Sequence, residues 1–444
     1  MEKLFEGNIR KKFFFFCLPL IFSTIMSQSN VIIDSIMVGR FIGDHALAAA
    51  SATSDFQTLI QGLFWGYSGG ATVYVAMLFG KGDYKKMANV IKVNILISSV
   101  IAILVSVGLI MAYKPMFEVL RIPQEIYNET LVYYNGSLMM LVLVNINCFF
   151  VYIYNAINKN RIAFILSFVS CALNISSKYI FIKICNLGIL GAVMGGAMSS
   201  LLATVVYIIY FIKILKQLDL KVSYIYLNMN ELKQSASLGF PNMLQQSIMY
   251  LCTTLISPLK NSCGAFALSG MSVGMKVYNI NAQIYQNSNK VLSNYIAQCV
   301  GAGKLNKINS GIKAGMMQTA IFLMPVLVVC ILGAEVIPNM FFDETSSPES
   351  IHYAQMFLKF VLPFAVFNAI NNMLHQIFRG AGASRYLVVS TAVYSVSNLV
   401  FSYLLFQKYA MYGIYAGMVL AWICETIFGG IIFFSGKWKP KKGL

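Results

Sequence analysis

Charge is scarce in this sequence of 444 residues: 11% are Asp, Glu, Lys or Arg, whereas 58% are hydrophobic. Soluble domains have roughly 25% charged and about 45–50% apolar residues. The shortage extends over the whole length and excludes an ordinary soluble protein. The apolar runs continue for 18 residues or more without alternation, so they predict membrane-spanning helices and not the strands of a barrel.

Motifs of enzymes and metal sites are missing as well. There is no Walker A element, no GxSxG and no HExxH, and the nine cysteines include no CxxC. The three histidines, His45, His352 and His375, are scattered along the chain. We therefore expect a protein that is not an enzyme and that holds no metal and no cofactor.

Twelve apolar runs are long enough to cross a membrane. The first follows the basic residues Arg10–Lys12 but has no convincing small-residue cleavage site, so we interpret it as a membrane helix and not as a signal peptide. The expected spans are 13–38, 47–79, 93–113, 128–157, 162–184, 188–212, 237–258, 265–300, 314–335, 351–378, 387–407 and 413–436.

The basic residues are distributed unevenly between the two sides of the membrane. With twelve spans both ends of the chain lie on one side, and 23 of the 33 Lys and Arg residues fall on that side, against six on the other. The positive-inside rule therefore predicts cytoplasmic termini in a multi-pass protein of the cell membrane. The net charge of +17 is explained by this topology and by attraction to anionic lipid head groups, and we expect no nucleic-acid partner.

The two halves of the chain resemble each other at an offset of about 222 residues. LFGKGDYKK, ending the second expected span, matches CVGAGKLNK, ending the eighth, and NLGILGA at 186–192 matches MYGIYAG at 411–417. Further pairs follow in the same order: Pro19 with Pro241, Asn145 with Asn368, Arg161 with Arg385, and Asn174 with Asn398. Two parallel six-helix repeats predict an all-α integral membrane protein with lobes 1–212 and 237–444 and a cytoplasmic linker at 213–236. This architecture suits a transporter whose halves rock around a central cavity.

Several short motifs taken together resemble the multidrug and toxic compound extrusion (MATE) family. They are DSIMVGRFIGDHALAAAS near the first span, the GKGD and GAGK turns, FRGAGASR after the tenth span, and the Asn of the fifth span followed by NLGILGA. The resemblance covers nearly the whole chain. It implies a V-shaped, two-lobed bundle that opens alternately to each side of the membrane. It also implies export of organic cations or other amphipathic compounds, driven by H⁺ or Na⁺.

Asp34 is a carboxylate inside the apolar stretch NVIIDSIMVGR. An ionisable residue within a span is a functional-site hypothesis. The rise per residue places Asp34 about 32 Å from the start of the first span, in the outer half of the membrane. The resemblance implies that an aspartate here takes part in ion coupling. A structural role, in an interhelical hydrogen bond or at a water-exposed helix end, is the alternative.

The fifth span departs from the family pattern, which often has Asn and then Asp four residues later. In NISSKYIF, Asn174 is present but Lys178 stands at the aspartate position. Residues four apart share a helix face, so Lys178 is expected to face the same cavity and to form an ion pair with Asp34. Alternatively, its side chain snorkels to the outer surface. The ion pair predicts altered coupling and argues against a Na⁺ site in this lobe.

Other polar and aromatic residues are expected to line a substrate cavity. Methionine and aromatic ring faces accept varied amphipathic cations. Glu425, in the twelfth span, either offsets a lysine or faces water. The cavity candidates are Asp55, Tyr67, Asn145, Asn147, Tyr152, Gln245, Gln246, Tyr278, Tyr285, Lys290, Asn368, Asn372 and His375.

These features predict a secondary-active exporter of amphipathic, cationic small molecules that works as a monomer in the lipid bilayer. H⁺ is the expected coupling ion, ahead of Na⁺. A flippase of the same superfamily, moving a lipid-linked oligosaccharide or lipid precursor, is the alternative. Lys178 and Lys290 support that alternative, because cations in a cavity suit an anionic substrate such as a pyrophosphate.

Overall fold

The computed structural model describes residues 3–120, 122–218, 226, 228–342 and 347–440. These described residues form helices joined by short turns, and none of them lies in a strand. The chain divides into two compact units. The N-terminal unit comprises Leu18–Met243, and the C-terminal unit comprises Met1–Cys17 together with Leu244–Leu444.

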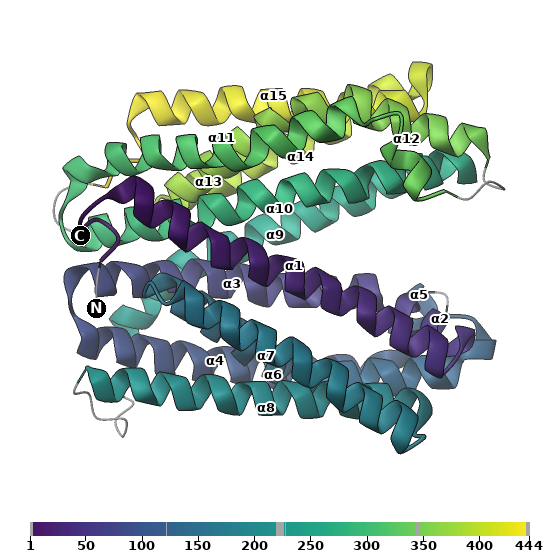
Figure 1. Ribbon diagram of the computed structural model, residues 1–444, viewed down its shortest axis with the longest axis horizontal. Helices are drawn as coiled ribbons and strands as arrows, with labels where there is room; N and C mark the ends of the chain where they lie inside the picture. Colours follow the sequence, from purple (N-terminus) through teal and green to yellow (C-terminus); the bar gives the residue numbers. More distant parts are fainter. Residues whose placement is uncertain (1–2, 121, 219–225, 227, 343–346, 441–444) are drawn as a thin grey trace. The chain divides into compact units, whose positions relative to one another are not determined.

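The N-terminal unit contains most of α1 (Ile9–Phe41) and is centred on α6 (Tyr127–Ala156). Its other long helices are α3 (Ser54–Lys81), α4 (Tyr84–Met111), α7 (Asn160–Tyr179) and α8 (Gly188–Gln217). Helix α6 packs against α3, α4 and α8, and α7 packs along α8 (Figure 1). The short elements are α2 (Asp44–Ala52), α5 (Tyr113–Leu120), η1 (Gln124–Ile126) and a π-helical turn, η2 (Ile180–Ile184).

The C-terminal unit is centred on α10 (Ala265–Gly301), which packs against α11 (Ile308–Leu332), α12 (Pro348–Phe360) and α13 (Ala365–Gly380). Helices α14 (Ser384–Tyr409) and α15 (Met411–Ser435) pack along each other, and α15 also contacts α13. Helix α9 (Met229–Ser262) begins in the N-terminal unit and ends in this one. The short 3-10 elements are η3 (Leu305–Lys307), η4 (Ile337–Met340) and η5 (Leu362–Phe364).

Eight helical spans among the described residues are long and apolar enough to cross a membrane. Helices α1, α3, α9 and α10 have 33, 28, 34 and 37 residues. At 1.5 Å per residue they also exceed the hydrocarbon thickness of about 30 Å. With α12 and α13 counted as one broken span, the predicted set of twelve helical spans is confirmed.

Some predicted helix boundaries were wrong. The expected span 47–79 is divided into α2 and α3 at Thr53, and 351–378 is interrupted by η5, whose Pro363 cannot donate a backbone hydrogen bond. Helix α4 begins at Tyr84 and not near 93, and α9 begins at Met229 and not near 237. Both starts carry buried polar residues, Asn89 and Glu231, which lower the local hydropathy.

The glycine turns predicted from the repeat close two corresponding helices. Gly82 ends α3 with φ of 87°, and Gly303 follows α10 with φ of 69°. Only glycine adopts this left-handed conformation at little cost. After the first turn, Asp83 caps α4 by accepting a hydrogen bond from the Lys86 amide at 3.2 Å.

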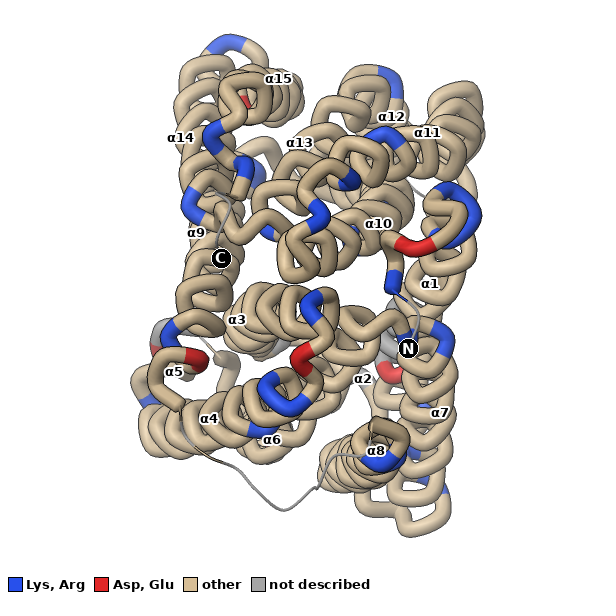
Figure 2. Tube along the Cα trace, turned by 90° about the vertical axis from the view of Figure 1, so that its left-hand side faces the viewer, with Lys and Arg blue, Asp and Glu red and all other residues tan. Residues whose placement is uncertain are grey.

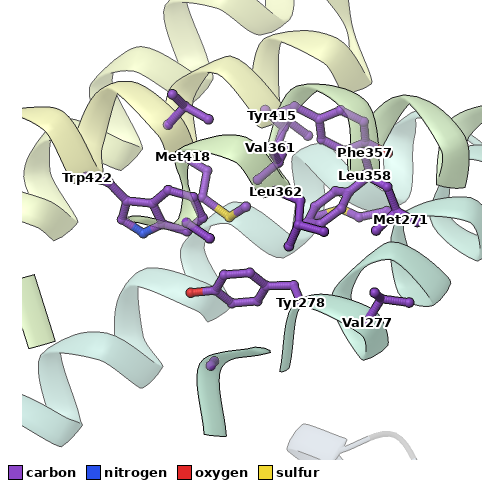
Figure 3. Close-up of a cluster of buried hydrophobic side chains, with 14 of the residues drawn as sticks. Met271, Val277, Tyr278, Phe357, Leu358, Val361, Leu362, Tyr415, Met418 and Trp422 are labelled. Atoms are coloured by element: carbon purple, nitrogen blue, oxygen red, sulfur yellow. The ribbon is translucent and has the colours of Figure 1, made fainter. Parts of the chain in front are cut away.

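Charged side chains lie mainly at helix ends. Figure 2 shows the end at which α1 begins and α15 ends, where Lys and Arg predominate over Asp and Glu. Between the helix ends the C-terminal unit has an apolar core. Aromatic and aliphatic side chains from α10, α12, η5 and α15 meet there (Figure 3), among them Tyr278, Phe357, Leu362, Tyr415 and Trp422.

Candidate functional site

The N-terminal unit contains the ion pair that the sequence predicted. Lys178 Nζ lies 2.7 Å from Asp34 Oδ2, so the end of α7 contacts the C-terminal part of α1. The Lys178 side chain is only 9% exposed, whereas that of Asp34 is 28% exposed. Lys178 therefore does not snorkel to the surface, and its charge is compensated inside the unit.

Glycines of α8 allow Lys178 to sit at this depth. A Cβ atom at Gly195 would lie 2.6 Å from Lys178 Cα, and one at Gly196 would lie 3.6 Å from Lys178 Cε. Gly191, in the NLGILGA motif, similarly faces the carbonyl of Phe181. These glycines permit close packing of α7 and η2 against α8. This packing sets the position of Lys178 along the helix bundle.

Two buried side-chain oxygens, one on Asp34 and one on the helix that carries Lys178, have no hydrogen-bond partner among the described residues. They are Oδ1 of Asp34 and Oδ1 of Asn174. Asn174 lies four residues before Lys178 on α7, so the amide and the ammonium share one face of the helix. The N-terminal site therefore holds one cation, one carboxylate and a neutral amide oxygen that can accept a hydrogen bond from a displaced ammonium.

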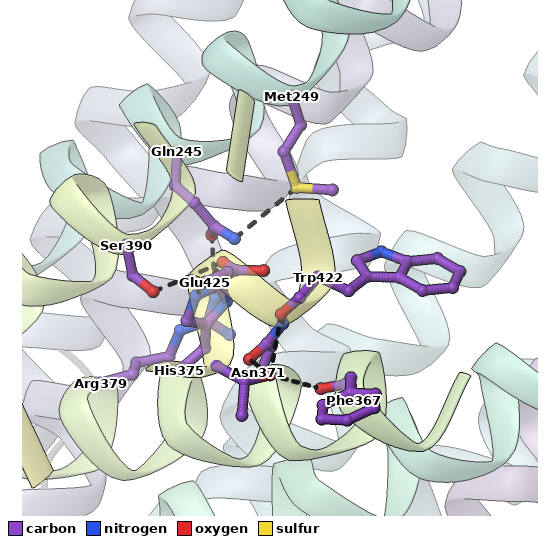
Figure 4. Close-up of polar contacts among 10 residues, drawn as sticks. Gln245, Met249, Phe367, Asn371, His375, Arg379, Ser390, Trp422 and Glu425 are labelled. Atoms are coloured by element: carbon purple, nitrogen blue, oxygen red, sulfur yellow. Dashed lines mark hydrogen bonds and ion pairs between the residues drawn. The ribbon is translucent and has the colours of Figure 1, made fainter. Parts of the chain in front are cut away.

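The C-terminal unit holds a second polar cluster, formed by α13 and α15 (Figure 4). His375 Nε2 lies 3.0 Å from Glu425 Oε1, and Ser390 of α14 donates to the same carboxylate oxygen at 3.4 Å. The side chains of His375 and Glu425 are 11% and 6% exposed. One turn away, Asn371 donates to the Trp422 carbonyl at 2.9 Å and accepts from Thr426 at 2.7 Å.

Further hydrogen bonds extend this cluster in two directions. Arg379 donates to Gln376 at 3.3 Å and to Gln245 of α9 at 3.5 Å, and Gln245 in turn donates to Met249. A separate chain runs from Asn368 to the hydroxyl of Tyr278 at 2.6 Å and on to Tyr285 at 3.0 Å. The Tyr278 ring stacks on Trp422, with 5.5 Å between the ring centroids.

Pairing of Glu425 with His375 was missed by the sequence analysis, which considered a lysine or water as the partner. The signal available was a carboxylate and an imidazole, each isolated in an apolar span. Ionisable groups in spans tend to pair with one another. Fifty residues separate them, however, and no local spacing rule fixes how α13 and α15 face each other.

Three predicted cavity residues take part in hydrogen bonds between helices of the N-terminal unit. Tyr67 donates to Asn94 at 2.9 Å, and Asn145 donates to Ser98 at 3.2 Å. Asn147 donates to the carbonyl of Ser200 at 3.1 Å and accepts from Thr204 at 2.9 Å. These bonds explain why polar residues are tolerated in the spans, and contact with a substrate stays a prediction for all three.

The remaining candidates are dispersed. In the C-terminal unit Lys290 donates to Asn287 at 3.2 Å, and Asn372 accepts from Asn289 at 3.1 Å. Gln246 and Tyr152 are half-buried on α9 and α6, in different units. The side chain of Asp55 lies outside the described part of the chain.

An all-α membrane protein with two six-helix repeats and buried charged pairs has the architecture of a solute transporter. The MatE family model matches this chain in two segments, residues 19–180 and 238–404, so the chain belongs to the MatE family of transporters. One matched segment lies in each half of the chain.

Relatives of similar length extend this comparison. The chain is 20% identical over 441 residues to "Probable multidrug resistance protein YpnP" of Bacillus subtilis (strain 168), covering 98% of this chain and 97% of the relative. It is 23% identical over 397 residues to "Multidrug export protein MepA" of Staphylococcus aureus (strain MSSA476), covering 87% and 86%. A solved structure described as the "Outward-facing conformation of a multidrug resistance MATE family transporter of the MOP superfamily" aligns with a TM-score of 0.87. It has 17% identity and covers 98% of each chain, and thus shows a common fold.

Proposed function

We propose that this protein exports amphipathic, cationic small molecules by alternating access and that H⁺ entry drives the export. Membership of the MatE family and the multidrug-export names of the relatives support the transport class. The observation that carries the choice of ion is the 2.7 Å contact between Lys178 and Asp34. This contact supports H⁺, because a carboxylate already paired with a fixed cation leaves little place for a metal cation.

Asp34 can either pair with Lys178 or bind a proton, and these two alternatives form a two-state switch. In the first state the Lys178 ammonium holds Asp34 as a carboxylate. In the second, a proton on Asp34 neutralises it, and the ammonium turns to Asn174 Oδ1, which is buried and has no other hydrogen-bond partner among the described residues. In each state a different oxygen accepts the hydrogen bond from the Lys178 ammonium. Protonation of Asp34 therefore shifts the equilibrium between two arrangements of α1 and α7.

Sodium fits this site poorly. A Na⁺ ion would need several oxygen ligands close together, and the ammonium of Lys178 would repel it at short range. A proton adds no ligand requirement, because it binds covalently to one carboxylate oxygen. The coupling ion proposed for the N-terminal unit is therefore H⁺.

Reconstituted protein provides the test. Export of a fluorescent organic cation is measured in proteoliposomes with either an imposed pH difference or an imposed Na⁺ difference. We expect the pH difference to drive export and the Na⁺ difference to have no effect. The Asp34→Asn variant should bind the cation but lose about tenfold or more of the pH-driven rate, since no proton can exchange at residue 34.

Matched variants separate charge from packing. Lys178→Asp changes the charge pattern and should abolish the switch, whereas Lys178→Arg keeps a cation and should retain part of the rate. Full pH-driven export by Asp34→Asn would contradict the proposed role of the pair. Failure of the wild type to respond to either gradient, together with movement of a lipid-linked precursor, would instead identify a flippase.

A further inference from the structure

The His375–Glu425 contact is a buried ionisable pair that the proposed N-terminal switch does not use. Both residues lie in membrane-spanning helices of the C-terminal unit, and their side chains are 11% and 6% exposed. Placing ionisable groups inside a membrane protein is costly, and where they persist they commonly mark ion or proton pathways. The pair therefore requires an explanation of its own.

We propose that His375 and Glu425 form a second proton-binding site, separate from Asp34, which takes up and releases one proton between α13 and α15. The carboxylate of Glu425 approaches Nε2 of His375 to 3.0 Å, and Nε2 makes no aligned hydrogen bond to any described residue. The two groups therefore lie close enough for an electrostatic interaction. Its strength depends on whether the imidazole is charged.

Proton uptake changes the charge of the pair without any other bond being broken. With one proton on the ring, the imidazole is neutral and Glu425 leaves a net charge of −1. The added proton occupies the second ring nitrogen, and the resulting imidazolium faces the carboxylate, so the pair becomes neutral overall. Histidine is the side chain whose charge changes most readily between about pH 5 and pH 8.

The groups around the pair come from four helices. Arg379, one turn after His375 on α13, is a fixed charge, and it donates to Gln376 and to Gln245 of α9. The phenols of Tyr278 and Tyr285 on α10 and of Tyr394 on α14 lie close enough to interact electrostatically with Glu425. Phenols stay neutral in the physiological range. His375 is the imidazole among these groups, and imidazole is the side-chain type that changes charge between about pH 5 and pH 8.

The consequence for transport, which rests on the proposed function, is local to the C-terminal unit. The imidazolium attracts Glu425 and holds α13 against α15. The neutral ring attracts it less, and among the described residues Glu425 then keeps the Ser390 hydroxyl as its hydrogen-bond donor. Release of this proton would thus loosen one helix contact and leave an anion that attracts a cationic substrate.

Histidine nuclear magnetic resonance can observe this site directly, because the chain has three histidines. Replacement of His45 and His352 by Gln leaves His375 as the one imidazole in the full-length protein. With ¹⁵N-labelled histidine in lipid nanodiscs, we expect the ring to change from singly to doubly protonated as the pH falls from 8 to 5. A ring that keeps one protonation state throughout this range would overturn the proposal.

Glu425→Gln tests the partner. Loss of the carboxylate should reduce the doubly protonated fraction at pH 6.5 by about threefold or more, because a neighbouring anion favours the imidazolium. Glu425→Asp should restore part of this fraction. Glu335→Gln is the matched control, since Glu335 is exposed and pairs with Lys359, and it should leave the His375 signal unchanged. An unchanged signal in a folded Glu425→Gln protein would also overturn the proposal.

Transport measurements keep the two proposals distinguishable. The resonance experiment needs neither substrate nor gradient, so its result stands even if the wild type proves not to be driven by protons. If export by the wild type is driven by protons but His375 never changes protonation, the proposed second proton site is refuted. The proposed role of Asp34 is then unaffected. If both hold, His375→Gln should lower pH-driven export severalfold while Asp34 remains intact.

Discussion

At the scale of single residues, the two partners of the Asp34–Lys178 pair differ in burial, and this difference predicts unequal mutational effects. Removing one partner of a buried ion pair leaves an uncompensated charge, at a cost of about 3–5 kcal/mol. Lys178 is 9% exposed and Asp34 is 28% exposed, so the lysine left alone is the worse case. Asp34→Asn should therefore destabilise the protein more than Lys178→Met.

The double variant Asp34→Asn/Lys178→Met is the control for this prediction. It removes both charges, and a neutral pair of similar volume is often tolerated well. Thermal unfolding in detergent should rank the double variant above Asp34→Asn in melting temperature. A double variant no more stable than Asp34→Asn would show that packing, and not charge, dominates at this position.

The Asp34–Lys178 pair could be predicted from the sequence, whereas the His375–Glu425 pair could not. Lys178 stands four residues after Asn174, at a position where the family pattern has an acid, so both its helix face and its unusual charge could be read directly. His375 and Glu425 carry no such spacing. Their contact depends on the rotation of α13 against α15, which follows from side-chain packing across the whole helix pair.

At the scale of helices, the close approach of α7 and α8 predicts a sharp difference between two glycines. A Cβ at Gly195 would lie 2.6 Å from Lys178 Cα, a backbone atom that can move only with its helix. Gly195→Ala should therefore separate α7 from α8 and lower stability by about 1–3 kcal/mol. It should also weaken the Asp34–Lys178 contact and reduce pH-driven export.

Gly108 in α4 is the matched control, because a Cβ there would have nothing within 4 Å. Gly108→Ala should be neutral or stabilising by roughly 0.5–1 kcal/mol, since alanine reduces the entropy lost when the helix forms. Melting temperatures of the two variants should thus change in opposite directions. An equal change in melting temperature for both variants would contradict the packing argument, because a new contact is expected at Gly195 and not at Gly108.

The start of α4 also fixes a segment distant in sequence. Asn89 donates to the Tyr226 carbonyl at 2.9 Å and accepts from the Tyr226 amide at 3.2 Å, as a neighbouring strand would. Asn89→Ala should expose that amide, and hydrogen exchange at Tyr226 should become about tenfold faster. Asn89→Asp keeps the acceptor and should preserve most of the protection. Equal exchange in wild type and Asn89→Ala would show that other contacts hold this segment.

Hydropathy was sufficient to predict the existence of the long helices but not their interruptions. A window of about 20 residues averages over the break at Thr53 and over the single turn of η5. It also ends early where a helix continues into polar but buried residues, as α4 and α9 do at Asn89 and Glu231. These features depend on individual hydrogen bonds and prolines, which average hydropathy does not register.

At the scale of the whole chain, the internal repeat explains why the same glycine turns and glycine-mediated helix contacts occur in both halves. Gly82 and Gly303 make corresponding left-handed turns, and the final helix pair of each repeat packs through glycine, at Gly195 in α8 and Gly413 in α15. The charged sites have diverged in the meantime. The N-terminal unit has a lysine–aspartate pair and the C-terminal unit a histidine–glutamate pair, so the two halves carry different ionisable groups.

Orientation in the membrane is the remaining property of the whole chain, and it follows from the charge count. Because 23 of the 33 basic residues belong to the side that carries both ends of the chain, that side should be cytoplasmic. A green fluorescent protein fused after the last residue should therefore fluoresce in cells, and alkaline phosphatase at the same place should be inactive. Fusions after Tyr409, between α14 and α15, should give the opposite pattern, because one fewer helix precedes them. Phosphatase activity at the full-length C-terminus would reverse the orientation and with it the direction of transport inferred for a proton-driven exporter.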